Sequence, residues 1–174
     1  ADLPDRTQQA LDVVVTQVRR FDSMVMDLLE LSRIDAGSTE LHREEVDVRE
    51  LIPRIAQRYG FGDVAIETDK KVPSLVRLDK LRFERILANL LENAGKFTPA
   101  QTPVEVLVRA ANDELRVSVR DHGPGVAEGQ EELIFEKFTR GAAESATPGV
   151  GLGLAICRAI VEAHGTRAAY YAHA

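Results

Sequence analysis

The sequence has no tryptophan, a single cysteine and few aromatic residues, which make up 5% of its 174 residues. Cys157 alone cannot form a disulfide within the chain, so the composition fits a reducing compartment. Positive charge is also scarce, because 22 lysines and arginines stand against 28 acidic residues and the net charge is −6. Since nucleic-acid-binding surfaces carry a positive field, this balance argues against a nucleic-acid partner.

Long apolar runs are missing as well. No stretch approaches the roughly 20 apolar residues of a membrane-spanning helix, and no signal-peptide pattern opens the sequence. We therefore expect a cytoplasmic domain, and the anchor of any membrane-bound parent protein would lie outside this sequence. Hydrophobic residues (44%) and charged residues (29%) occur in the proportions of a globular protein.

The N-terminal part predicts one long helix, from about Thr7 to Asp35, which Gly37 and Ser38 are expected to end. A lone helix cannot bury an apolar seam by itself, so it needs a partner. Two interpretations are open: the helix packs on the rest of the chain, or it forms half of a dimeric bundle. The sustained heptad spacing favours the bundle. The seam consists of Leu11, Val14, Val18, Phe21, Val25 and Leu28.

The remainder of the chain mixes helical and strand periodicity. This pattern predicts an α+β fold, a two-layer sandwich of helices on a mixed, mostly antiparallel sheet, preceded by the long helix. After a connector at 40–46, Asp47 and Glu50 are spaced as a capping box and open a helix that contains Pro53. Strands are expected at 64–68 and 75–78, followed by a helix at 79–97 and a hairpin of strands at 104–109 and 114–120. A short apolar helix within 127–148 and a final helix at 151–164 complete the expected elements.

The helix at 79–97 carries the first candidate site. Asn89, Asn93 and Lys96 follow one another at helical spacing and so lie along one line beside the apolar stripe. A carboxamide oxygen is a suitable ligand for magnesium when phosphates complete the shell, and a lysine can contact a phosphate. Asn93 or Lys96 alone is best interpreted as a solvated surface residue. The pair, followed by Phe97-Thr98-Pro99 and by later glycine motifs, predicts a magnesium–phosphate surface.

A second candidate follows the hairpin. Asp121 comes directly after a predicted strand and precedes Gly123-Pro-Gly125. A carboxylate here can accept a hydrogen bond from an exocyclic amine such as that of adenine, and glycines let backbone approach a flat ring closely. The alternative is an aspartate in a tight turn, which is a common arrangement.

A third candidate opens the final helix, where Gly149, Gly151 and Gly153 recur at every second residue. Backbone amides without side chains at a helix N-terminus make an anion site. The spacing fits neither a dinucleotide-binding motif nor a phosphate loop. Since glycine inside a helix is destabilising, three glycines within five positions indicate a functional or structural requirement.

Aromatic residues precede these glycines. Phe135 and Phe138, together with Ile134, either anchor a mobile lid on the sheet or form a minor core. Lys137 and Arg140, in the same segment, are candidates to turn inward to phosphate.

In this order, the motifs resemble the catalytic, ATP-binding domain of bacterial sensor histidine kinases of two-component signal transduction. The wider fold is shared with DNA gyrase, a heat-shock chaperone and mismatch-repair ATPases. The match runs from about Val46 to Gly165, and Met-Asp-Leu-Leu-Glu-Leu-Ser-Arg-Ile-Asp-Ala-Gly at 26–37 resembles the second helix of the kinase dimerisation domain. The resemblance implies a partial dimerisation helix at 1–38 and an ATP-binding domain at 46–174, shortened at its C-terminal strands.

The resemblance also implies the cofactors, ATP and Mg²⁺, and a role for each site residue. Asn93 would be the magnesium ligand, Asn89 would support it, and Lys96 would contact phosphate. Asp121 would recognise adenine. The other expected nucleotide contacts are Phe97, Gly123, Gly125, Phe138, Arg140, Gly149, Gly151, Gly153 and Leu154.

Asn89 bears on the reaction. The ATPases of the wider fold place a glutamate four residues before the magnesium asparagine, where it activates water. A carboxamide cannot act as that base, so Asn89 favours transfer of the γ-phosphate to a histidine over hydrolysis. A non-catalytic nucleotide-binding module and a hydrolysing ATPase of the same fold are the alternatives.

Two departures from the family pattern shape the expected partners. None of the four histidines stands in the family's acceptor context, so we expect another segment or chain to supply the acceptor, with a response regulator as an indirect partner. The helix at 7–35 is expected to pair in a homodimer or bundle. The family also continues with further strands where this chain has Ala-Ala-Tyr-Tyr-Ala-His-Ala, which predicts a sheet without one edge strand.

Overall fold

The structure is a computed structural model that describes residues 5–36, 40–60, 64–99, 102–111, 114–139, 151–166 and 168. The chain divides into two compact units, Ala1–Thr39 and Glu40–Ala174. The first unit contains helix α1 (Asp5–Asp35), in agreement with the predicted long helix. The expected stop at Gly37 and Ser38 lies outside the described residues.

The predicted seam of α1 is largely exposed to solvent. Leu11, Val14, Val18 and Phe21 are all exposed, and Leu28 is exposed to a smaller extent. A helix with an exposed apolar face gains stability when a partner covers that face, which is what the bundle interpretation requires. The structure describes a single chain, so the bundle stays a prediction. Among the described helices, none combines the length and the apolar composition that crossing a membrane requires.

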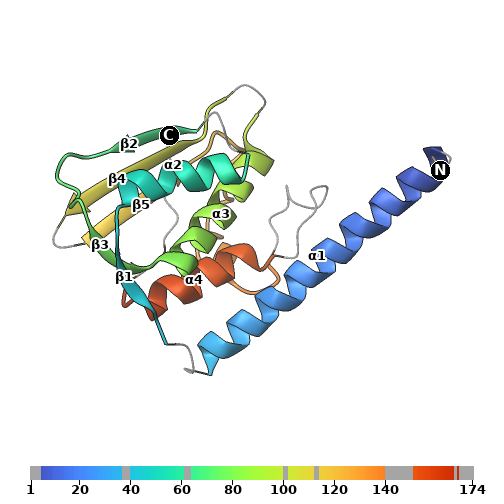
Figure 1. Cartoon of the computed structure of the whole chain (residues 1–174), viewed down its shortest axis with the longest axis horizontal. Coiled ribbons are helices and arrows are strands. Elements are labelled where there is room, and N and C mark those ends of the chain that lie inside the picture. The colour runs from blue at the N-terminus through green and yellow to red at the C-terminus, as the bar shows by residue number, and fades with distance from the viewer. Residues whose placement is uncertain are drawn as a thin grey trace. The chain divides into compact units, whose positions relative to one another are not determined.

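The second unit holds helices on a three-stranded sheet, as the sequence pattern predicts, and it has a separate two-stranded sheet (Figure 1). Strand β2 runs parallel to β4, and β4 pairs antiparallel with β5, which confirms the predicted hairpin. The elements are β1 (Arg43–Val46), α2 (Val48–Arg58), β2 (Ala65–Thr68), β3 (Val76–Asp79), α3 (Lys80–Phe97), β4 (Glu105–Ala111), β5 (Glu114–Arg120), the 3-10 turn η1 (Leu133–Phe135) and α4 (Gly153–Ala163).

Strand β1 corrects one prediction, because residues 40–46 are not a simple connector. Residues 43–46 pair antiparallel with β3, from Arg43 opposite Asp79 to Val46 opposite Val76. Only Val46 of the four is buried, so the strand has no apolar alternation by which it can be recognised. Its partner strand defines it, and a single-sequence pattern does not record that partner.

Helix α2 begins where the capping pattern predicts. The Asp47 side chain accepts a hydrogen bond from the amide of Arg49 at 2.9 Å, which satisfies one of the free amides at the helix start. The helix then continues through Pro53 to Arg58.

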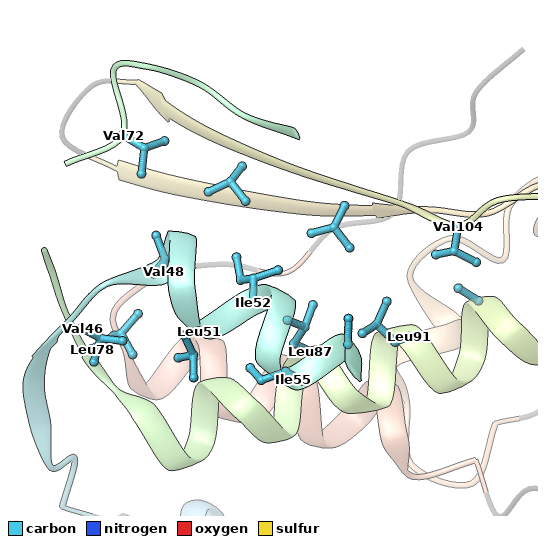
Figure 2. Close-up of a cluster of buried hydrophobic side chains, with 14 residues drawn as sticks. Val46, Val48, Leu51, Ile52, Ile55, Val72, Leu78, Leu87, Leu91 and Val104 are labelled. Atoms are coloured by element: carbon cyan, nitrogen blue, oxygen red, sulfur yellow. The ribbon is translucent and has the colours of Figure 1, made fainter. Parts of the chain in front are cut away.

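The core lies between the helices α2 and α3 and the three-stranded sheet (Figure 2). Its best-buried side chains are Val48, Ile52, Leu87, Leu91, Val106 and Val108. Burial of each contributes about 1.5–3 kcal/mol relative to exposure. Helix α4 packs against α3 as well, and its Ile156 and Ile160 are fully buried. The position of α3 is therefore set by apolar contacts with α2, α4 and the sheet, and α3 carries the first candidate site.

Candidate functional site

Helix α3 presents its polar residues beside a buried stripe. The side chain of Asp79 caps it by accepting a hydrogen bond from the amide of Arg82 at 3.1 Å. Asn89 and Asn93 are half-buried, and Lys96 is exposed. The Lys96 ammonium lies 4.0 Å from the exposed carboxylate of Glu92, a pair that contributes little to stability. Lys96 is thus near the asparagines on a helix edge that an anion can reach.

The loop after β5 approaches the end of α3 through Gly123. A methyl group on the Cα of Gly123 would lie 3.0 Å from Cβ and 3.1 Å from the carbonyl oxygen of Phe97. Asp121 Oδ1 accepts a hydrogen bond from the Gly123 amide at 2.8 Å, which closes a tight turn. Gly125 then adopts a φ of 72°, a conformation that favours glycine. The turn interpretation of Asp121 thus holds for one carboxylate oxygen, and its role toward adenine stays a prediction.

The start of α4 meets the segment that contains η1. The Phe138 amide donates a hydrogen bond to the Gly151 carbonyl at 2.9 Å. Gly151 has a φ of 74°, and a methyl group on its Cα would lie 2.5 Å from the Thr139 carbonyl oxygen. Only glycine fits at position 151 here. We call this contact of Gly151 with Phe138 and Thr139 the Gly151 junction. Two predicted site residues, Arg140 and Gly149, lie outside the described residues.

Gly153 places the first turn of α4 against Asn89. A methyl group on its Cα would lie 3.6 Å from Asn89 Oδ1, which is an ordinary van der Waals distance. Leu152 precedes the helix and provides no side-chain cap for its first amides. Free amides at a helix N-terminus attract anions, so the helix start can serve a phosphate beside Asn89. Leu154, also predicted, is half-buried in this turn.

Two buried polar atoms at the site have no hydrogen-bond partner within the described part of the chain. They are Nδ2 of Asn89 and Oγ1 of Thr98. Such atoms are costly unless a ligand or a water molecule satisfies them, so they mark polar positions where a ligand can bind. The sequence motifs assigned no role to Thr98; the available signal was its place directly after Phe97.

Cys157 lies on α4 close to Asn89. Its Sγ is 3.7 Å from the Ile86 carbonyl oxygen. Complete burial raises the pKa of the thiol to about 12, while contact with the Asn89 carboxamide and the charge of Arg85 oppose the rise. At neutral pH the thiol is therefore a neutral packing group that holds α4 next to α3.

The two predicted phenylalanines have different environments. Phe135 is 7% exposed and belongs to a small core, whereas Phe138 is 59% exposed. Phe138 also has a φ of 65°, which costs a non-glycine residue about 1–2 kcal/mol. Strained, exposed residues are concentrated at functional sites. Phe135 therefore fits the minor-core interpretation, whereas Phe138 is not packed in a core, and the lid role of the pair stays a prediction.

The chain matches a known protein family and has named relatives. Residues 78–173 match the model of the family described as "Histidine kinase-, DNA gyrase B-, and HSP90-like ATPase". The chain is 42% identical over 145 residues to Sensor protein KdpD of Escherichia coli (strain K12), covering 82% of this chain and 16% of that protein. It is 37% identical over 163 residues to Sensor histidine kinase MtrB of Mycolicibacterium paratuberculosis, covering 90% of this chain and 29% of that protein.

Solved structures show the same relation. Full-length ShkA in complex with AMPPNP is similar with a TM-score of 0.80 and 30% identity, over 95% of this chain and 35% of that one. The catalytic domain of histidine kinase ThkA is similar with a TM-score of 0.61 and 30% identity, over 71% of this chain and 82% of that one. The chain spans less than a third of the length of the two curated relatives. It belongs to the histidine kinase-, DNA gyrase B-, and HSP90-like ATPase family, as an ATP-binding domain of the sensor histidine kinase type.

Proposed function

We propose that this chain is the phosphate-donating part of a histidine kinase. It binds Mg-ATP and transfers the γ-phosphate to a histidine that another segment or chain supplies, in two-component signal transduction. The observation that carries the proposal is the convergence of the predicted motifs on one helix, because Gly123 approaches Phe97 and Gly153 approaches Asn89 at the two ends of the polar line of α3.

The geometry supports a direction for the nucleotide. The adenine base lies at the Asp121–Gly125 loop, where the second carboxylate oxygen of Asp121 accepts from its amine. The phosphates lie at the start of α4, where the uncapped amides and the unpartnered Nδ2 of Asn89 are donors. Lys96 adds a positive charge. Asn93 is the ligand for a magnesium ion, which would neutralise phosphate charge as the γ-phosphate leaves.

Transfer rather than hydrolysis follows from position 89. The amide of Asn89 cannot take a proton from water, and the nearby Glu92 is exposed beside Lys96. Positioning and electrostatic stabilisation, the main sources of catalysis in phosphoryl transfer, are available from the remaining groups.

The acceptor is not His164. Its Nδ1 lies 2.8 Å from the Ile160 carbonyl oxygen, and its Nε2 accepts a hydrogen bond from the Asp79 amide at 3.3 Å. Both ring nitrogens are therefore engaged, Nδ1 within α4 and Nε2 with Asp79 at the start of α3. We propose that a dimerisation-type acceptor helix supplies the histidine and that α1 pairs with such a helix through its exposed seam. A solved complex of histidine kinase ThkA with response regulator protein TrrA supports a response regulator as the next partner.

A transfer assay tests the proposal. The chain is incubated with magnesium and γ-labelled ATP, and with a separate helical protein that carries a histidine in the kinase acceptor context. We expect acid-labile, alkali-stable label on the acceptor, and we expect Asn93→Ala to abolish it. Lys71→Ala, in the exposed loop between β2 and β3, serves as a control that leaves transfer unchanged.

Each other outcome supports one of the alternatives. Nucleotide binding without phosphohistidine on any supplied acceptor would contradict the kinase function and support a non-catalytic module. Release of phosphate without an acceptor, at an appreciable rate and lost in Asn93→Ala, would support an ATPase in spite of Asn89.

A further inference from the structure

Arg158 on α4 contacts the segment Glu131–Thr139 at three points. Its Nη2 donates to Glu132 Oε2, and its Nη1 lies 3.8 Å from Glu136 Oε1. The guanidinium carbon lies 4.4 Å from the centre of the Phe135 ring. The arginine side chain is 21% exposed, so most of it is packed against this segment. None of the sequence motifs assigned a role to this residue.

The regular structure described within this segment is one short turn. The turn η1 is three residues long, and no side chain caps it. A single 3-10 turn is not stable on its own, so tertiary contacts decide where it lies. Phe135, the one buried residue of the turn, lies beneath the guanidinium of Arg158.

The far end of the same segment reaches the candidate site. The Phe138 amide donates to the Gly151 carbonyl, and Thr139 lies against the Cα of Gly151. Gly151 in turn precedes the helix start that packs on Asn89. The segment is therefore held at two points, by Gly151 just before α4 and by Arg158 on the helix.

We propose that Arg158 is a positioning residue for nucleotide binding. It fixes η1 against α4, and this places Phe138 and Thr139 at the Gly151 junction in the arrangement that binds phosphate. The inference rests on the proposed function. Arg158 does not touch the nucleotide, so its removal weakens binding through the position of the segment and leaves the core of the unit intact.

The test compares matched arginine variants of the whole chain. We expect Arg158→Ala to raise the Kd for Mg-ATP about three- to tenfold, because partly buried cation–π and ion-pair contacts are of moderate strength. Arg158→Lys keeps the charge and the stem and restores most of the affinity. Arg109→Ala is the control, since it breaks an ion pair of 2.8 Å with Glu67 on the sheet and leaves the Kd unchanged.

Hydrogen exchange provides a second measurement that does not depend on the nucleotide. In Arg158→Ala the amide of Phe138 is expected to exchange faster, while the amides of α3 keep their protection. Glu132→Gln combined with Glu136→Gln changes only exposed carboxylates, so it tests the two ion pairs of Arg158 even if the alanine variant folds poorly. This double variant is expected to show a smaller change in the same direction.

The outcomes separate the inference from the proposed function. If the parent chain binds Mg-ATP and both Arg158→Ala and the double variant bind it equally well, the inference is wrong and the proposed function stands. If the parent chain does not bind Mg-ATP, the proposed function fails and the inference fails with it.

Discussion

Gly123 and Gly151 each bring a loop close to a neighbouring segment, but the atoms that they approach differ in how easily they can move. At Gly123, the nearest atoms to an added methyl group include the Asp121 carboxylate at 2.8 Å, which belongs to a side chain that can rotate. At Gly151, the nearest atoms are all backbone atoms of Phe138 and Thr139, and the φ of 74° excludes most side chains as well. The proposed adenine end thus has some freedom to adjust, whereas the proposed phosphate end has almost none.

The largest expected effect is that of Gly151→Ala. The methyl group would overlap the Thr139 carbonyl, and the left-handed backbone adds strain, so we expect the free energy of unfolding to fall by about 3 kcal/mol or more. The Kd for Mg-ATP should rise at least about tenfold. Urea unfolding and nucleotide titration measure the two quantities.

Gly129→Ala is the matched control for this substitution. Gly129 has a φ of 80°, but an added methyl group would meet nothing within 4 Å. It isolates the backbone strain, which is about 1–2 kcal/mol. Equal losses for Gly129→Ala and Gly151→Ala would show that the junction with Thr139 yields easily, contrary to the structure.

Gly123→Ala is expected to have an intermediate effect. The methyl group displaces the Asp121 carboxylate and presses on Phe97, so we expect a loss of about 1–2 kcal/mol in the free energy of unfolding. In an Asp121→Ala background, the same substitution should cost less, because one of the two obstructions is gone. Urea unfolding of the four chains of this cycle measures the difference. A constant cost in both backgrounds would place the whole obstruction at Phe97.

Gly153→Ala should separate stability from function. The methyl group has room beside Asn89 at 3.6 Å, and alanine favours a helix over glycine by up to about 1 kcal/mol. We therefore expect unchanged or slightly higher stability. If phosphate binds at the amides of this turn, the methyl group crowds it, and the Kd for Mg-ATP should rise severalfold. Unchanged affinity would remove Gly153 from the nucleotide contacts.

These contrasts show what the sequence alone predicts and what it leaves open. The periodicity of α3 and of the β4–β5 hairpin is local and strong, so it predicted both elements. Strand β1 was missed because its pairing with β3 leaves only Val46 as a signal. The motif residues were identified by their order, but which glycine meets which neighbour depends on how distant segments pack, and no local pattern contains that information.

The aromatic pair illustrates the same limit. Phe135 and Phe138 are separated by only two residues and share one motif, yet one is buried and the other is exposed. Arg158 accounts for part of this difference, because it covers Phe135 from α4. An arginine in an apolar helix reads from sequence as a solvated residue, so its contact with a distant turn could not be predicted.

The smallest effect is expected at Cys157, and it tests how tightly α4 packs at the proposed phosphate end. The folded pKa is raised from 9.0 to about 12 by burial, so the thiol contributes stability that is fully present below pH 9 and is lost as the pH rises toward 12. By pH 10 the unfolded thiol has ionised and the folded one has not, which lowers the free energy of unfolding by about 1.4 kcal/mol. The effect is absent at pH 7.

Cys157→Ala provides the comparison, since lysines and tyrosines also titrate at high pH. Urea unfolding of both chains from pH 7 to pH 10 should give curves that stay parallel up to about pH 8 and then converge or cross as only the parent loses the thiol contribution. Curves that stay parallel throughout would mean that water reaches the thiol in the folded chain. The packing of α4 on α3 beside Asn89 would then be looser than the contact at Gly151. Only the contact at Gly151 would then make the proposed phosphate end rigid.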